Sequence, residues 1–418
     1  MVPKGWSHTT FEKHIDCLTG FAFSSTEYSA EEHDIRLLRG DNIEPGKLRW
    51  INAKRWPRNV QGNMDKYFLL EGDFVIALDR TWISGGLKVA EVTCDDLPCL
   101  LVQRVARIRA KKTLAQGLLR QYFSGYKFEQ YVKLTQTATA VPHISPNDIK
   151  QFSLLLPPIA EQKKIAQILS TWDKAIAVTE KLLTNSQQQK KALMQQLLTG
   201  KKRLLDENGE RFSGEWKFKR ISEIATRVQR KNDTSEHPIL TISSLSGFVR
   251  QDERYSRYMA GESIKNYILL KKGEFAYNKG NSKTYEFGCV FDLDKYEAGL
   301  VPHVYVCFKL KQGLSHRYFK YLFEADYLKP QLGALVNTGV RNNGLLNIKP
   351  TEFMETRVPV PCFEEQERIA DMLYNSSRII RVLQGKLACL KEEKKALMQQ
   401  LLTGKRRVKV EMEETVNA

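Results

Sequence analysis

The sequence predicts an α+β protein made of two homologous halves, each a mixed α/β domain followed by a long helix. The first observation is a repeat: residues 190–201, Lys-Lys-Ala-Leu-Met-Gln-Gln-Leu-Leu-Thr-Gly-Lys, return unchanged as residues 394–405. The match extends upstream at the same spacing of 204 positions, because Glu161-Gln162 recurs as Glu365-Gln366. Two copies of about 200 residues are too long and too few for a solenoid, so we infer a duplication.

The second observation is that each copy ends in a stretch with the features of one long helix. No Gly or Pro interrupts residues 159–198, and Pro158 and Gly200 flank them as start and stop signals. Apolar residues recur at alternating steps of four and three, which is the heptad pattern of a coiled coil. The residues predicted to pair the helices are Ile165, Leu169, Trp172, Ile176, Leu183, Leu193, Leu197, Ile369, Leu373, Ile380, Leu387, Leu397 and Leu401.

Two arrangements of these helices are compatible with the pattern. The narrow apolar stripe favours antiparallel pairing of the two helices as a coiled coil, related by a pseudo-two-fold axis. The alternative is that each helix packs only on its own domain. Lys190 and Lys394 fall at the same position of the stripe, where a charge is expected to lower stability but fix the register.

The repeat also predicts the domain boundaries. Strand-like runs such as residues 74–78 and 100–108 are separated by Gly- and Asp-containing turns, and a helix is expected over residues 114–134. In the second half, strand-like runs at residues 287–291 and 304–310 precede a helix expected over 315–328. These patterns predict a bent, mainly antiparallel sheet in each domain. The predicted segments are a first domain, 1–156; a central helix, 157–200; a linker, 201–216; a second domain, 217–360; a C-terminal helix, 361–404; and a polar tail, 405–418.

Composition and charge restrict the class of protein. The net charge is +17, with 21 basic against 17 acidic residues (+4) in the first domain and 27 against 19 (+8) in residues 201–360. Both globular parts are therefore basic, as expected for two surfaces that bind a polyanion. No apolar N-terminal stretch or membrane-length run is present, and seven cysteines without a CxxC pair argue against disulfides and zinc. We expect a cytoplasmic protein without a metal.

No catalytic motif stands out in the chain. There is no phosphate-binding loop of the G-x-x-x-x-G-K-[ST] type and no H-E-x-x-H, and the seven histidines are scattered. Leu156-Pro157-Pro158-Ile159 lacks both the polar residue and the aromatic of an adenine-methyltransferase motif, and prolines that open a helix explain it. The chain is therefore expected not to be an enzyme.

Two turn regions are candidates for contact with DNA instead. Arg, Lys and Asn side chains can read base edges, and Gly lets the backbone approach closely; ordinary solvated turns are the alternative. The candidate residues are Lys54, Arg55, Arg58, Arg80, Trp82 and Lys88 in the first domain, and Lys279, Asn281, Lys283, Arg341, Asn342 and Asn343 in the second.

The repeated helix signature resembles that of the specificity subunits of type I restriction-modification systems. The resemblance rests on Leu-Pro-Pro-Ile-Ala-Glu-Gln at 156–162, on the repeated twelve residues and on the Trp at the start of each domain. It implies two target recognition domains, each reading half of a bipartite double-stranded DNA site, on a non-catalytic subunit. It also implies two partner methyltransferase subunits that use S-adenosylmethionine and, through them, restriction subunits that use ATP and Mg²⁺. The helices would set the spacer between the half-sites.

Two other functions remain open from the sequence. One is a coiled-coil DNA-binding scaffold or transcription regulator. A helix-turn-helix motif would favour this alternative, and the sequence shows none. The other is an orphan or silent specificity protein without an active nuclease partner. The recognised DNA sequence does not follow from these residues.

Overall fold

The computed structural model describes residues 2–58, 64–138, 141–233, 236–254, 261–336 and 346–410, with only the backbone for 261–263. The chain divides into two compact units, described separately below. Unit 1 comprises Met1–Glu180 and Gly385–Ala418, and unit 2 comprises Lys181–Gln384. The two long helices each contribute to both units, because each crosses the boundary between them.

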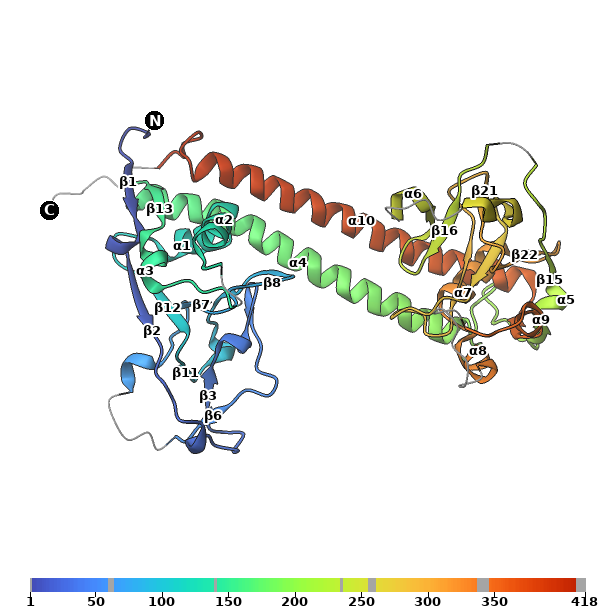
Figure 1. Cartoon of the computed structure of the whole chain (residues 1–418), viewed down its shortest axis with the longest axis horizontal. Coiled ribbons are helices and arrows are strands. Elements are labelled where there is room, and N and C mark those ends of the chain that lie inside the picture. The colour runs from blue at the N-terminus through green and yellow to red at the C-terminus, as the bar shows by residue number, and fades with distance from the viewer. Residues whose placement is uncertain are drawn as a thin grey trace. The chain divides into compact units, whose positions relative to one another are not determined.

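Unit 1 combines short strands with three short helices and parts of the two long ones (Figure 1). Its strands are β1 Ser7–Thr10, β2 Ile15–Thr19, β3 Ile35–Leu38, β4 Ile43–Glu44, β5 Lys47–Leu48, β6 Arg55–Trp56, β7 Phe74–Ala77, β8 Trp82–Ile83, β9 Gly86–Leu87, β10 Val89–Glu91, β11 Cys99–Leu101, β12 Val105–Ala110 and β13 Ser153–Leu156. Its helices are α1 Gln116–Phe123, α2 Tyr126–Thr135, α3 Pro146–Gln151 and the first part of α4 Ile159–Leu197.

The central sheet of unit 1 is antiparallel with the order β10-β7-β12-β2. A second sheet, β11-β3-β6, contains the parallel pair β11 and β3, and β1 pairs with β13. The strand expected over 100–108 is two strands, β11 and β12, because the chain turns at Arg104, which has a φ of 65°. The helix expected over 114–134 is likewise broken at Gly125, where an added Cβ would lie 3.1 Å from the carbonyl oxygen of Gln121.

Unit 2 repeats this plan with fewer strands. Its strands are β14 Lys217–Arg220, β15 Ala225–Arg227, β16 Leu240–Ser243, β17 Gly247–Arg250, β18 Ile268–Lys271, β19 Phe275–Asn278, β20 Cys289–Asp292, β21 Ala298–Val301, β22 Val306–Leu310 and β23 Arg357–Val360. Its helices are α5 Ile221–Ile224, α6 Gln251–Arg254, α7 His316–Glu324, α8 Lys329–Leu335, α9 Pro350–Met354 and the first part of α10 Phe363–Leu401.

The central sheet of unit 2 has the order β15-β22-β19-β20, which corresponds strand for strand to β2-β12-β7-β10 in unit 1. The pair β14 and β23 corresponds to β1 and β13. The helix expected over 315–328 ends at Glu324, because Asp326 adopts a left-handed conformation with a φ of 54°. The two units therefore share the order of the central sheet and the outer strand pair, although their sequences differ widely outside the repeat.

The core of each unit receives one end of each long helix. In unit 1, Ile165 and Leu169 of α4 are fully buried in one apolar cluster with Leu401 of α10. In unit 2, Ile369 of α10 is buried in one cluster with Leu197 of α4. In unit 1 the cluster also includes aromatic residues of α1 and α2, and in unit 2 it includes aromatic residues of α7 together with Leu332 of α8. Both ends of each helix are thus integral parts of a unit.

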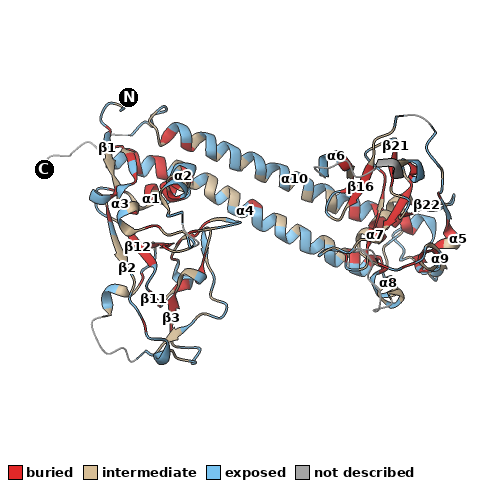
Figure 2. Cartoon of the chain, in the orientation of Figure 1, coloured by how far each residue is buried: buried red, intermediate tan, exposed pale blue. Residues whose placement is uncertain are grey.

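The predicted helix-pairing residues divide into two groups. Those near the helix ends lie in the unit cores, as described above for Ile165 and Leu197. Figure 2 shows the middle portion of the two helices as mostly exposed. The predicted pairing residues in this portion are only partly buried: Trp172, Ile176, Leu183, Ile380 and Leu387. The terminal residues therefore contribute much more apolar burial to the fold than the central ones.

Within unit 1, α4 and α10 contact each other in an antiparallel direction. The ammonium of Lys394 lies 2.6 Å from the carboxylate of Asp173, and that of Lys391 lies 2.8 Å from Glu180. Residue numbers rise along α4 as they fall along α10, which defines the direction. Lys394 is thus neutralised by the facing helix, and the cost expected for an unpaired charge in the stripe does not apply.

Lys190, the copy of Lys394 in the first repeat, has different partners. Its ammonium lies 2.6 Å from Glu324 of α7 and 5.3 Å from the ring centroid of Tyr321, within unit 2. The position equivalent to Asp173 is Ser377, which cannot supply a charge. The two identical lysines therefore do not share one register-fixing role, since only Lys394 pairs across the helices.

The repeated Glu forms the same buried cluster in both units. In unit 1, the carboxylate of Glu161 accepts hydrogen bonds from the indole of Trp6 at 3.0 Å and from the guanidinium of Arg407 at 2.7 and 2.8 Å. In unit 2, Glu365 accepts the same bonds from Trp216 at 2.9 Å and from Arg203 at 2.6 and 2.7 Å. We name these the Trp-Glu-Arg clusters. Each ties the chain that follows one long helix to the start of the other.

The repeated Gln holds the short helices in place. The side-chain carbonyl of Gln162 accepts a hydrogen bond from the backbone N–H of Ala115, just before α1, at 2.8 Å. Gln366 does the same for Ser315, just before α7, at 2.9 Å. Both glutamines are buried, so these bonds are shielded from water. The repeated Glu-Gln pair thus makes the same two contacts in both units: the Glu binds Trp and Arg side chains, and the Gln binds the backbone before a short helix.

Candidate nucleic-acid interface

The predicted contact loops occupy equivalent places in the two units. In unit 1 the segment after β7 leads through the β8–β9 hairpin to β10, and in unit 2 the segment after β19 leads to β20. The segment after β7 is anchored by the N–H of Ile144, which donates to the carbonyl of Leu78 at 2.9 Å. In unit 2 the N–H of Leu346 donates to Lys279 at 3.1 Å. The shared topology thus presents one loop region per unit.

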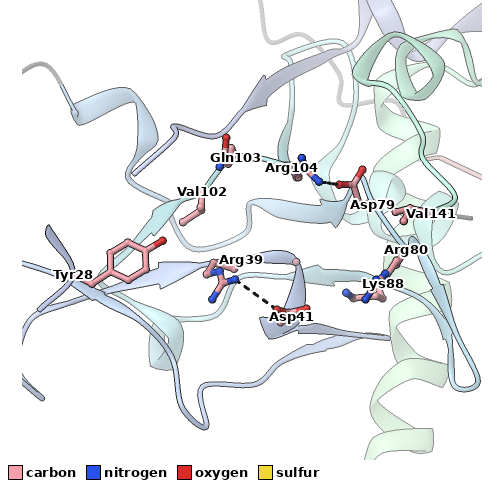
Figure 3. Close-up of a pocket in the computed structure, with 11 residues that line it drawn as sticks. Tyr28, Arg39, Asp41, Asp79, Arg80, Lys88, Val102, Gln103, Arg104 and Val141 are labelled. Carbon is pink, nitrogen blue, oxygen red and sulfur yellow. Dashed lines mark hydrogen bonds and ion pairs between the residues drawn. The ribbon is translucent and has the colours of Figure 1, made fainter. Parts of the chain in front are cut away.

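In unit 1 this region borders a pocket of about 410 Å³, which lies within the size range of ligand-binding pockets (Figure 3). Arg80 and Lys88, both predicted from the sequence, lie on one side of it. The residues lining the pocket are Tyr28, Arg39, Gly40, Asp41, Asp79, Arg80, Lys88, Val102, Gln103, Arg104 and Val141. Four cations against two carboxylates leave the lining with a net positive charge, which suits an anionic ligand.

The acidic residue Asp79 connects three segments around the pocket. Its carboxylate lies 2.8 Å from the guanidinium of Arg104 and 2.6 Å from Nδ1 of His143. Burial acts to raise the pKa of Asp79, but the hydrogen bonds from His143 and Arg104 outweigh it and hold the pKa below its usual value. The next residue, Arg80, has a φ of 46° and donates its backbone N–H to Pro142 at 2.8 Å. Asp79 is therefore ionised at neutral pH and ties its neighbours together.

The other candidates in unit 1 do not line this pocket. Arg55 donates to the backbone carbonyl of Asp34 at 3.0 Å, and Arg58 donates to that of His33 at 2.7 Å. Lys54, just before β6, is exposed. Trp82 packs against the core of unit 1, and the ammonium of Lys133 lies 3.8 Å from its ring centroid. Arg55, Arg58 and Trp82 thus have contacts within unit 1. Among the described residues, neither Arg80 nor Lys88 forms an ion pair.

In unit 2 the predicted residues form a turn. The side-chain oxygen of Asn278 accepts the N–H of Gly280 at 2.9 Å, which leaves Asn281 and Lys283 exposed. Lys279 is partly buried, and this burial lowers its pKa. Arg341, Asn342 and Asn343 lie outside the described residues.

Sequence reasoning missed several residues of the pocket. Asp79 directly precedes Arg80, whereas Arg39, Asp41, Gln103 and Arg104 reach the pocket from turns that are distant in sequence from Arg80. A basic residue at the turn between two strands, as at Arg104, is the one local signal that was available. No sequence pattern indicated that these turns would meet.

The described residues contain neither a metal-binding cluster nor a membrane-spanning helix. No three His, Cys, Asp or Glu side chains come together there in a way that suits a metal ion. No helix in that part of the chain combines the length and apolar character needed to cross a membrane.

Residues 35–185 match a family model, the type I restriction modification DNA specificity domain. The chain is similar in sequence to type I specificity subunits. The specificity subunit of the type I restriction enzyme EcoAI from Escherichia coli is 34% identical over 182 residues, which are 43% of this chain and 30% of that subunit. The specificity subunit of EcoKI from Escherichia coli strain K12 is 22% identical over 389 residues, 88% of this chain and 81% of that subunit. The resemblance drawn from the repeated helix signature is thereby confirmed.

A solved structure has the same fold as this chain over nearly its whole length. The S subunit of a type I restriction-modification system from M. genitalium aligns with a TM-score of 0.56 and 12% identity, covering 96% of both chains. At such low identity the similarity shows a common α+β fold and no more. The match to the EcoAI subunit spans less than a third of that protein's length, so functional details belong to the proposal below.

Proposed function

We propose that this chain is the DNA sequence-specificity subunit of a type I restriction-modification complex. Each unit contributes one target recognition domain, 1–156 or 217–360, that reads one half of a bipartite site in double-stranded DNA. The helices 157–200 and 361–404 join these domains as an antiparallel coiled coil with pseudo-two-fold symmetry, and 201–216 is the linker. The subunit has no catalytic role of its own.

One observation carries the proposal beyond family similarity. The two units share a strand order and the two buried attachments at Glu-Gln, yet the loops after β7 and β19 differ in sequence. A common frame with different basic loops is what reading two different half-sites requires, because base-edge contacts specify sequence while the frame positions them. The net charge of +17 supports a polyanionic partner.

The partners follow from this role. We infer two methyltransferase subunits, which supply S-adenosylmethionine, and restriction subunits that supply ATP and Mg²⁺ chemistry; this chain holds none of these groups. Exposed apolar side chains on α10, at Met372, Ile379 and Val382, offer a surface for such subunits. Because its partner is chromosomal DNA, we place the protein in the cytoplasm.

The decisive experiment is enzymatic. Purified alone, the chain is expected neither to methylate nor to cleave DNA, because all catalytic groups belong to the partners. With its cognate methyltransferase subunits it should direct adenine methylation to one bipartite sequence, measured by methylome sequencing of a host that expresses the pair. Methyl transfer by the isolated chain, or methylation without a split motif, would contradict the proposal.

Single substitutions separate the two reading units. Arg80→Ala should weaken binding by about 1–3 kcal/mol and relax one position in only one half-site if the guanidinium contacts a base edge. Lys283→Ala should affect only the other half-site. Each variant is the control for the other, and binding to a library of randomised sites measures both. A change in both half-sites from one substitution would disprove independent reading.

A further inference from the structure

Lys88 is an unusual residue for its position. Only 7% of it is exposed, although its side chain borders the pocket beside Arg80 (Figure 3). Lysines are rarely buried to this degree unless they are paired, since removing an ammonium from water is costly. The backbone of Lys88 lies in the sheet region, where its N–H donates to Thr81 at 2.8 Å and its carbonyl accepts from Ala77 at 3.1 Å. These two hydrogen bonds fix the backbone position from which the Lys88 side chain extends.

A counter-ion for this ammonium is missing from the described part of the chain. No carboxylate there lies within ion-pair distance of it. The acid that acts on Lys88 is Asp41, whose side chain is 81% exposed and lies 3.8 Å from Arg39. Burial lowers the pKa of Lys88, and Arg80 lowers it further, while Asp41 only partly compensates. The pocket thus contains a nearly buried ammonium that has no ion-pair partner among the described residues.

Two other residues that line the pocket, Asp79 and Arg104, are held by contacts of their own. Asp79 binds the guanidinium of Arg104 and the imidazole of His143, as described above, and Arg104 itself has a left-handed backbone. A non-glycine residue in this conformation costs of order 1 kcal/mol and persists only where its surroundings hold it. Gly40 also lines the pocket, and a Cβ added there would lie 3.9 Å from the Lys88 ammonium. The pocket is thus organised before any ligand arrives.

We propose that this pocket binds one phosphate of the DNA backbone, with Lys88 as its anchor and Asp79 as a positioning residue. The inference rests on the proposed function and deepens it, since it assigns a particular contact to unit 1. An ammonium is a compact point charge that suits a phosphate, whereas bidentate reading of guanine is better served by the planar fork of arginine. Lys88 fixes the register of unit 1 on the duplex, and more exposed residues such as Arg80 are left to read bases.

The test is a double-mutant cycle in which one change is made in the protein and one in the DNA. DNA binding is measured for the complex of this chain with the methyltransferase subunits. Neutral methylphosphonates replace the phosphates of the bipartite site one at a time. In the wild type, one position should weaken binding about tenfold, as expected for a charge-assisted hydrogen bond. In Lys88→Met the same replacement should have no further effect, and the logarithmic salt dependence of affinity should become less steep by about 0.9. Lys112→Met, which removes an exposed charge, should keep the full sensitivity at that position.

Two further variants keep the inference testable. Lys88→Arg retains the charge and should retain the sensitivity to that one phosphate, even if Lys88→Met proves unstable. Asp79→Asn should reduce the sensitivity at the same position and leave other positions unchanged. A merely structural role of Asp79 would instead weaken binding equally at all positions. The assignment would be overturned if the losses of binding free energy from Lys88→Met and from every methylphosphonate were additive. A changed base preference of the Lys88→Met variant would also overturn it.

The outcomes also distinguish this inference from the proposed function. If the wild type directs methylation to a bipartite site but no phosphate couples to Lys88, only the inference fails. If no bipartite methylation occurs, the proposed function itself fails. Inorganic phosphate at constant ionic strength forms a separate arm: stabilisation of the wild type by phosphate without any coupling to DNA would make the pocket a free-anion site and overturn the DNA assignment.

Discussion

Glu365→Ala is expected to destabilise unit 2 by about 3–5 kcal/mol, the usual cost of removing one partner of a buried ion pair. The carboxylate is fully buried, and both of its oxygens accept hydrogen bonds from Arg203, whose side chain is only 20% exposed. The hydrogen bonds to Glu365 raise the pKa of Arg203. Without Glu365 this increase is lost, but the guanidinium still stays charged, because arginine is not deprotonated in proteins. The indole N–H of Trp216 would lose its acceptor as well.

Hydrogen exchange by mass spectrometry locates this effect. Peptides from β19 and α7 should lose protection in Glu365→Ala, while peptides from β7 in unit 1 should keep it. Glu207→Ala is the matched control, because Glu207 lies 3.6 Å from Arg368 and is 91% exposed. Such a surface pair contributes about 0–1 kcal/mol. Equal protection in the two variants would show that the Trp-Glu-Arg cluster adds little to stability.

Exchange of residues 1–156 for the matching domain of a relative is expected to replace one half of the recognised site entirely. The half read by 217–360 should persist, because unit 2 has its own core and its own attachments to α4 and α10. The structure adds a condition for success. The incoming domain must supply a Trp at the place of Trp6, since Glu161 and Arg407 remain in the recipient and would otherwise lose a partner.

Methylome sequencing of the chimera beside its parent measures the outcome. A chimera carrying Trp6→Phe is the internal control, which should keep the new specificity but lose stability. Changes in both half-sites would contradict modular reading. Loss of all methylation by a stable, methyltransferase-bound chimera would show that the two units read DNA jointly.

Local sequence patterns account for the long helices and for much of the sheet. The prolines before Ile159 and Phe363 and the glycines at 200 and 404 correspond to the observed ends, and both glycines have positive φ, which favours glycine at a helix C-terminus. The strand expected over 74–78 corresponds to β7. The sequence patterns did not predict the break between two helices at Gly125 or the break between two strands at Arg104. In each case a single turn separates two stretches of similar composition.

The sequence by itself determined that the protein is a duplication, where its two long helices begin and end, and that both halves are basic. These properties are local or compositional, so a single chain reveals them. Only the tertiary structure decided that α10 returns to the core of unit 1, that Lys190 and Lys394 have different partners, and that Arg39 and Arg104 line one pocket with Lys88. The reason is that contacts between residues tens to hundreds of positions apart depend on how whole elements pack, which no local periodicity encodes.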